Sequence, residues 1–255
     1  EVNAGEKGDV KYALVGLPDA AVKESLDRIL SALSNAGFSK PRTHVTINLA
    51  PGDLRKEGVA FDLPIALGIL AATGQLKSDC LKDYLIAGEL ALSGETRSVR
   101  GGLAMGMLAA ELGRKGVILP LQAADEACLV DQSEVFAVES LSETIRFLSG
   151  QRELVPLDSS RSAFLQKPRA GEEIDFAEVK GQANLRRAVE VAVSGGHNLL
   201  ILGPPGSGKS MATKRIPTIL PQPSREEFLE ILRIHSAAGY TFSGESQFYR
   251  RPFRA

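Results

Sequence analysis

One short stretch of the sequence has the residue types of a phosphate-binding site. The stretch is Gly203-Pro204-Pro205-Gly206-Ser207-Gly208-Lys209-Ser210, which matches the spacing G-x-x-x-x-G-K-[ST]. Its glycines allow the backbone to curl so that successive N–H groups point at phosphate oxygens. Lys209 can reach the β- and γ-phosphates, and the Ser210 hydroxyl is placed to bind Mg²⁺. A glycine turn that only joined two elements would not need Lys-Ser at its end, so the stretch predicts a nucleotide site.

The sequence on either side predicts the elements that must position this loop. The apolar run at residues 198–202 predicts a short strand that ends at the loop. The residues after the loop are compatible with a helix up to Ile216, which Pro217 closes. A further helix is predicted at residues 183–193, before the turn Gly195-Gly196. A strand, a phosphate loop and a helix therefore follow one another in the order that such sites require.

The sequence after Ser210 lacks the carboxylates that nucleotide hydrolysis requires. No apolar run there ends in Asp-Glu, the pair that would hold Mg²⁺ and orient the attacking water. We therefore expect this chain to bind nucleotide but to contain no complete catalytic set.

The length and the periodicity predict two domains. At about 150 residues per domain, 255 residues correspond to one large or two ordinary domains. Up to residue 149, apolar strands alternate with helices, which predicts an α/β (α+β) fold. The predicted strands are 12–17, 44–49, 84–87, 117–119 and 135–138, with a hairpin at 93–95 and helices at 19–37, 62–72, 103–112, 123–130 and 141–148. The Pro- and Ser-rich residues 150–173 predict a protease-sensitive linker, and residues 174–255 form the second predicted domain.

Composition excludes several classes of protein. Hydrophobic residues make up 44% and charged residues 24%, which is typical of globular chains and not of disordered or collagen-like ones. The longest apolar stretch, residues 63–72, is shorter than the roughly 18 residues that span a bilayer. Cys80 and Cys128 have no paired spacing, which favours a reducing compartment. Residues 1–11 are polar and contain no secretory signal or initiating Met, so we expect a fragment of a cytoplasmic protein.

Several longer segments carry a resemblance to a known family. They are VGLPDAAVKES (15–25), NLAPGDLRKEG (48–58), FDLPIA (61–66), GEL (88–90), the phosphate loop, IHSAAG (234–239) and RPFR (251–254). Together they resemble the ComM/YifB family of magnesium-chelatase-like AAA+ proteins. The resemblance implies an N-terminal domain similar to the proteolytic domain of Lon, followed by the first part of a P-loop AAA+ domain. It also implies that this chain is a fragment, which lacks the first strand of the family fold and stops before the Walker B and arginine-finger segments.

The resemblance also assigns a segment upstream of the loop. Val179, Gly181 and Gln182 resemble the segment that lines the adenine site of AAA+ ATPases, where Gly181 would let a flat base approach closely. The same pattern, hydrophobic-x-Gly-Gln, is also typical of a simple helix start. Both interpretations stay open on the sequence alone.

The Lon resemblance raises the question of proteolysis, and the residues argue against it. The stretch that matches Lon's nucleophile motif is residues 57–62, in which Ala60 occupies the serine position. The stretch that matches the motif of the catalytic lysine is residues 101–106, in which Gly106 occupies the lysine position. A methyl group and a hydrogen atom can neither attack a peptide bond nor accept a proton. We therefore expect a domain without peptidase activity.

Other polar groups favour ordinary surface roles. Residues that could bind an anion or a metal, but are more typical of a solvated turn, are Glu89, Glu95, Arg97 and Arg100. The histidines His44, His197 and His235 are too far apart in sequence to predict a metal site. Arginines that could contact DNA phosphates, an adjacent subunit or only water are Arg250, Arg251 and Arg254.

The resemblance implies the function that we expect. It predicts an ATPase that uses ATP and Mg²⁺, works as a homo-oligomeric ring of six subunits, and acts on DNA as a helicase or branch-migration factor in recombination or natural transformation. One alternative is a magnesium-chelatase-type motor that drives metal insertion by partner subunits. Another is a protein-binding module built on the Lon-like scaffold. No membrane partner is expected.

Overall fold

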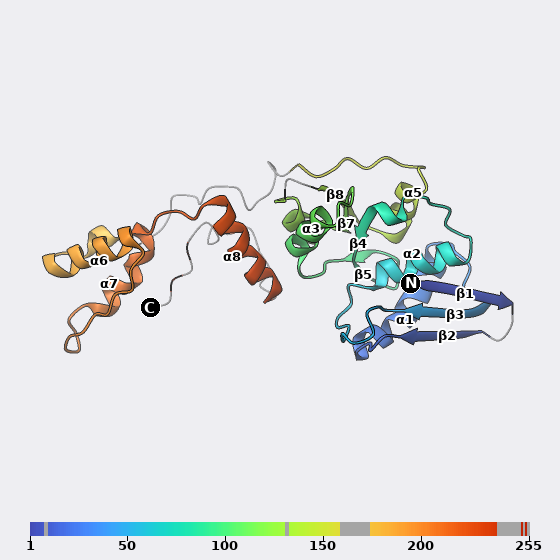
Figure 1. The fold of residues 1–255 in the computed structure, drawn as a ribbon, viewed down its shortest axis with the longest axis horizontal. Coiled ribbons are helices and arrows are strands. Elements are labelled where there is room, and N and C mark those ends of the chain that lie inside the picture. Colours follow the sequence, from blue (N-terminus) through green and yellow to red (C-terminus); the bar gives the residue numbers. More distant parts are fainter. Residues whose placement is uncertain (8–9, 131–132, 159–173, 239–250, 252, 254–255) are drawn as a thin grey trace. The chain divides into compact units, whose positions relative to one another are not determined.

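The computed structural model describes residues 1–7, 10–130, 133–158, 174–238, 251 and 253. The chain divides into two compact units, of which the first contains the elements from β1 to α5 and the second those from η4 through most of α8 (Figure 1). Helices and strands alternate in the first unit, so the chain has the α/β fold class that the sequence predicts. No described helix is both long enough and apolar enough to cross a lipid bilayer.

The first sheet of the N-terminal unit has three strands, β1 (Val2–Lys7), β2 (Lys11–Val15) and β3 (Thr43–Asn48). Their order is β1-β3-β2, with β1 antiparallel and β2 parallel to β3. Helix α1 (Ala20–Asn35) makes the crossover between the two parallel strands. This arrangement is a mixed sheet with its one long crossover on a helix.

Helix α1 forms where the sequence predicts it because both of its ends carry the expected signals. The carboxylate of Asp19 caps the helix by accepting a hydrogen bond from Val22 N at 2.8 Å, and this bond lowers the pKa of Asp19. Val22, Ile29 and Leu33 recur at helical spacing and are buried. Gly37, at a φ of 85°, follows the end of the helix.

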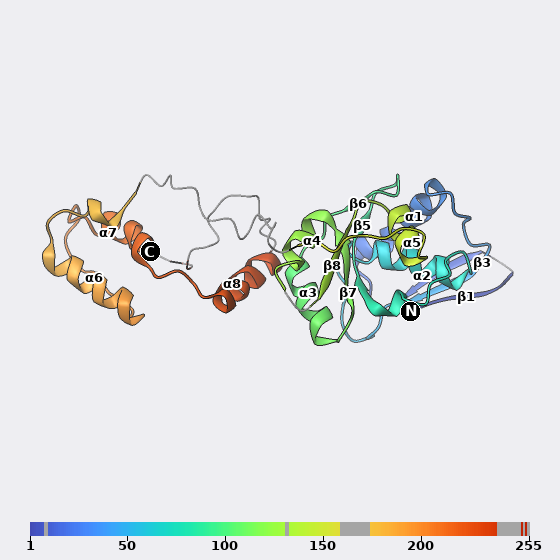
Figure 2. The same cartoon turned by 90° about the horizontal axis from the view of Figure 1, so that it is seen from above.

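The second sheet is parallel and is ordered β4-β7-β8. Its strands are β4 (Tyr84–Ile86), β7 (Gly116–Pro120) and β8 (Glu134–Val138). The elements around it are η1 (Leu81–Asp83), the predicted hairpin β5 (Glu89–Leu90) with β6 (Thr96–Arg97), α3 (Gly102–Glu111), α4 (Leu121–Ala127) and α5 (Leu141–Leu148). Figure 2 shows α3 and α4 side by side next to this sheet.

Helix α2 (Asp62–Ala72) packs into the main core of the first unit. That core also contains Val45 and Ile47 of the first sheet and Ile118 and Phe136 of the second. Most α2 residues, polar and apolar, are buried, because neighbours cover the helix on several sides. The core therefore joins both sheets through one apolar helix.

Strand β1 lies in a stretch to which the sequence analysis assigned no helix or strand. The N-terminal residues are polar and show no strand periodicity, yet β1 pairs with β3 from Val2 opposite Ile47 onward. Backbone hydrogen bonds to β3 create this edge strand, and only Val2 packs a sizeable apolar side chain on the core. An edge strand needs less hydrophobic alternation than a central one, so periodicity alone did not predict it.

The second unit has a small core and no sheet in its described part. Its elements are η4 (Phe176–Glu178), α6 (Ala183–Gly195), α7 (Lys209–Arg215), η5 (Ile216–Ile219) and α8 (Arg225–Ala237). The helices at residues 183–193 and after the loop are confirmed. The strand predicted at residues 198–202 is wrong for the structure, because no described strand lies beside that run to pair with it.

Part of the predicted linker is attached to the first unit. Leu157 N donates to Val135 O at 2.8 Å, and Leu154 packs against the main core. Residues 151–158 are therefore anchored, contrary to the expectation that nothing holds this stretch. The rest of the predicted linker, up to residue 173, lies outside the described residues, and the two predicted domain boundaries stay predictions.

Candidate nucleotide-binding site

The phosphate loop is a tight turn that leads directly into α7. Gly206 and Gly208 have φ angles of 79° and 82°, in the left-handed region that a residue with a side chain adopts at a cost. A Cβ on Gly203 would lie 3.1 Å from the Ser207 hydroxyl oxygen, which is a close approach across the loop. The glycine spacing of the motif therefore corresponds to backbone conformations that the turn needs.

Lys209 folds back over the loop that precedes it. Its Nζ donates hydrogen bonds to Gly203 O and Pro204 O, both at 2.8 Å, and lies 3.3 Å from the Ser207 hydroxyl oxygen. No carboxylate forms an ion pair with Lys209 within the described part of the chain. Among the residues that the structure describes, the ammonium group at the loop therefore has no acidic partner. Ser210, the predicted Mg²⁺ ligand, is the next residue and is exposed.

The upstream segment contacts the phosphate loop through Gln182. Gln182 Nε2 donates to Ser207 O at 3.0 Å, although 25 positions separate the two residues. Gly181 and Gln182 both have positive φ, at 72° and 46°. Val179 is fully buried in the core of the second unit and so anchors the segment. The structure thus brings the two predicted parts of the site together.

Comparison with known proteins places the chain in a family. Two family models match it: one described as subunit ChlI of Mg-chelatase over residues 1–123, and one described as magnesium chelatase, subunit ChlI, over residues 175–255. The competence protein ComM of Haemophilus influenzae is 40% identical over 252 residues, which is 97% of this chain and 48% of that protein. The YifB protein of Escherichia coli is 40% identical over 98% of this chain and 48% of its own length.

This chain belongs to the ComM/YifB family of magnesium-chelatase-like proteins. The chain spans about half the length of the curated relatives it matches. The second family model covers both the phosphate loop and the Val179–Gln182 segment. The resemblance that the sequence motifs carried is therefore confirmed.

The two positions that the sequence analysis aligned with the motifs of Lon's dyad both pack against neighbouring backbone and side chains. Gly106 lies on α3 against α4, where a Cβ would come within 3.0 Å of Ala127 O. A side chain as long as lysine would not fit there without moving α4. Ala60 packs against a second apolar cluster of the first unit, formed by β7, α3 and α4 with their neighbours. Its carbonyl oxygen accepts a hydrogen bond from Gly88 N at 3.0 Å.

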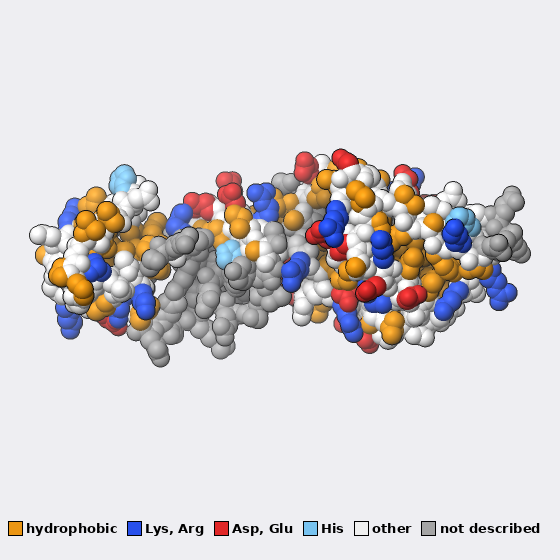
Figure 3. Space-filling view, turned by 90° about the horizontal axis from the view of Figure 1, so that it is seen from below, with side chains coloured by type: hydrophobic (Ala, Val, Ile, Leu, Met, Phe, Trp, Pro, Cys, Tyr) orange, Lys and Arg blue, Asp and Glu red, His pale blue; other side chains and the backbone are white. Residues whose placement is uncertain are grey.

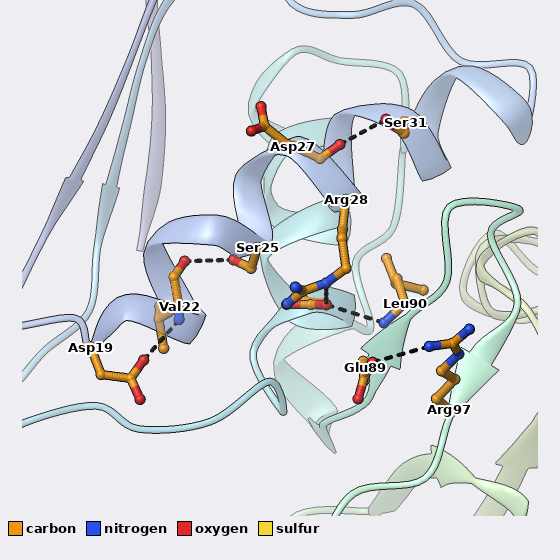
Figure 4. A network of polar contacts seen from close by, with 10 residues as sticks. Asp19, Val22, Ser25, Asp27, Arg28, Ser31, Glu89, Leu90 and Arg97 are labelled. Carbon is orange, nitrogen blue, oxygen red and sulfur yellow. Dashed lines mark hydrogen bonds and ion pairs between the residues drawn. The ribbon is translucent and has the colours of Figure 1, made fainter.

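The charged groups that the sequence left open do not gather into one site. Glu89 and Arg97 form an ion pair at 3.6 Å across the β5–β6 hairpin, as Figure 4 shows, while Glu95 and Arg100 are exposed. No group of three or more His, Cys, Asp or Glu residues that could hold a metal ion occurs among the described residues. The histidine and hairpin clusters therefore offer no metal centre in that part of the chain.

Arg251 has a partner that sequence reasoning missed. Its guanidinium donates to both carboxylate oxygens of Glu227, at 2.9 and 2.7 Å, and to Pro221 O at 2.9 Å. The hydrogen bonds from Arg251 lower the pKa of Glu227. The expectation of a merely solvated arginine is therefore wrong for this residue. Ser224 and Glu227 cap the start of α8 reciprocally, a pattern that the sequence analysis did not use and that carries no signal for an arginine partner. Arg250 and Arg254 lie outside the described residues.

A hollow of about 490 Å³ adjoins this part of the second unit but does not include the phosphate loop. Its lining comes from α6, α7, the exposed apolar run and the C-terminal segment, and includes Val189, His197, Ile201, Thr213, Ile216 and Arg251. The phosphate loop is therefore a separate, open feature of the surface.

Proposed function

We propose that this chain supplies the ATP-binding part of an AAA+ motor that acts on DNA. The observation that supports ATP binding most directly is Lys209, whose ammonium group is hydrogen-bonded to the carbonyls at the start of the loop and has no acidic partner among the described residues. Such a charge, beside a glycine turn with two left-handed glycines, suits the polyphosphate of a nucleotide.

The residues present fit ATP with Mg²⁺. Lys209 would exchange its carbonyl contacts for phosphate oxygens, and the exposed Ser210 hydroxyl would take one position on the metal. Val179, Gly181 and Gln182 would lie along the adenine, with Gln182 also holding the loop through Ser207 O. Mg²⁺ supplies charge neutralisation at the phosphates when bound. Because no Asp-Glu run follows Ser210 in this sequence, we expect this chain alone to bind ATP but to hydrolyse it negligibly.

The DNA part of the proposal rests on the family. One relative is named a competence protein, and this chain is 40% identical to it. We propose accordingly a homo-oligomeric ring, hexameric in the full-length protein and cytoplasmic, that promotes branch migration during recombination or transformation. We further propose that residues 1–149 form a Lon-like domain without peptidase activity. The names of both family models favour a second candidate, a motor for metal insertion by chelatase partners.

The test of the DNA proposal is DNA-stimulated ATP hydrolysis by the full-length protein. We expect branched or single-stranded DNA to raise the hydrolysis rate, and DNA affinity to fall steeply as salt rises, because phosphate contacts release counterions. The matched control is the Lys209→Ala protein, which should bind DNA without stimulated hydrolysis. Hydrolysis that DNA leaves unchanged, but that chelatase-type partners stimulate, would favour metal insertion instead.

A further inference from the structure

Three polar contacts attach the segment that precedes α6 to the phosphate loop, to α7 and to η5. Phe176 N donates to the Thr218 hydroxyl oxygen in η5 at 3.1 Å. Gln182 Nε2 donates to Ser207 O in the loop at 3.0 Å. Between these two points, an ion pair joins Glu178 to Arg215. The backbone from Val179 to Gly181 is thereby held from both sides.

The ion pair between Glu178 and Arg215 has more hydrogen bonds than either of the other two contacts. Glu178 Oε2 accepts hydrogen bonds from Arg215 Nε at 2.8 Å and from Nη2 at 2.5 Å. The remaining Arg215 nitrogen, Nη1, donates to Met211 O at 3.2 Å, and the Arg215 side chain is only 17% exposed. The guanidinium is therefore fixed in one orientation, whereas a typical surface arginine moves among many.

The ion pair connects the upstream segment to the helix that follows the phosphate loop. Arg215 ends α7, the helix that Lys209 begins. Glu178 directly precedes Val179, which is fully buried in the apolar cluster that also contains Ala212 of the same helix. A break in the ion pair would therefore release the upstream segment from α7 while the loop residues themselves stayed intact.

We propose that Glu178 and Arg215 are positioning residues that set the distance between the base-binding segment and the phosphate loop, and so select nucleotides over bare polyphosphates. This inference rests on the proposed function, in which ATP binds the loop and Val179–Gly181. A base and a triphosphate are bound together at least cost when their two sites are already at the right separation. A triphosphate without a base contacts the loop alone and does not depend on that separation.

The experiment compares two ligands, ATP and inorganic triphosphate, both with Mg²⁺, by calorimetry on this chain. Arg215→Met and Glu178→Gln should each weaken ATP binding about threefold to fivefold, the scale of a partly exposed ion pair. Binding of inorganic triphosphate should not change. The charge-reversed double variant, Glu178→Arg with Arg215→Glu, should restore ATP affinity.

Two controls separate positioning from general stability. Arg187→Met removes an exposed pair with Glu190 on α6, at 3.3 Å, and should alter neither ligand's affinity. The melting temperature without ligand shows whether each variant folds. If Arg215→Met does not fold, Glu178→Gln still allows the test, because the Glu178 side chain is 46% exposed and its replacement should disturb the fold less.

The outcomes are distinct. Equal weakening of ATP and triphosphate, or no weakening of either in a folded variant, overturns the inference while the proposed ATP site stands. A parent chain that binds neither ligand overturns the proposed function, and this inference with it.

Discussion

Strand β7 and residues 198–202 have similar apolar sequences but different structures. In β7, Val117, Ile118 and Leu119 are fully buried. In the other run, Leu200 and Leu202 are 80% and 83% exposed and form no strand. Figure 3 shows hydrophobic side chains at the surface of the second unit, which is at the left in that view.

Neighbouring strands make the difference between the two runs. β7 pairs with β4 on one side and β8 on the other, helices α3 and α4 pack on it, and all its residues are buried. Residues 198–202 have no such partner among the described residues. An apolar run therefore predicts a tendency to form a strand, but hydrogen-bonded neighbours decide whether the strand forms and what its side chains contribute to stability.

The largest expected effect is on stability: replacing a leucine by alanine should destabilise the protein far more in β7 than in residues 198–202. Leu119→Ala should lower the unfolding free energy of the first unit by about 2–5 kcal/mol, because it leaves a cavity in a closed core. Leu200→Ala should change stability by less than about 0.5 kcal/mol, because its side chain is already exposed. Urea unfolding of both variants measures this. Equal losses would contradict the comparison.

The two units also contain ion pairs of opposite character. In the first unit, Arg28 binds the fully buried Asp62 through Nε at 3.0 Å and Nη2 at 3.2 Å, and Asp62 also accepts a bond from Leu90 N (Figure 4). Burial raises the pKa of Asp62 despite these bonds. In the second unit, the more exposed Glu227 has a pKa that Arg251 lowers.

These opposite shifts predict opposite pH dependence. Because Asp62 holds its proton more tightly in the folded state, its contribution to stability rises as pH falls through its folded-state pKa. The contribution of Glu227 is present above its unfolded-state pKa and is lost as pH falls. We expect Asp62→Asn to cost about 1–2 kcal/mol at neutral pH, because the amide offers one acceptor oxygen where Arg28 and Leu90 N use two, and Glu227→Gln to cost less.

Unfolding of each variant against the parent chain, from neutral pH to about pH 3, measures the effect. The deficit of Asp62→Asn should widen toward acid, and that of Glu227→Gln should shrink. If the Asp62→Asn deficit instead disappeared in acid, the ion pair would dominate over burial at Asp62.

The sequence predicted those elements whose structure is determined by residues close together in the chain. The Asp19 cap and the spacing of Val22, Ile29 and Leu33 fix α1 within its own segment, and the glycines of the phosphate loop specify a turn. The hairpin at residues 93–95 is likewise a local structure, and it was found where expected.

The features that the sequence analysis did not predict depend on contacts between residues far apart in the chain. Strand β1 depends on β3, more than 35 positions away, and Gln182 reaches Ser207 only after α6 has folded back. The Arg251–Glu227 pair joins residues 24 positions apart with no periodic signal between them. A single sequence shows the charges but not their pairing, so these features had to come from the structure.

Nucleotide-induced stabilisation of this chain tests the central claim, that the Gly203–Ser210 loop binds ATP. Ligand at about 100 times its dissociation constant stabilises by roughly 2.7 kcal/mol, so saturating ATP with Mg²⁺ should raise the melting temperature of the second unit by several degrees. Lys209→Ala should abolish the rise, whereas Lys214→Ala, an exposed lysine of the same helix, should retain it. An undiminished rise in Lys209→Ala would contradict the account.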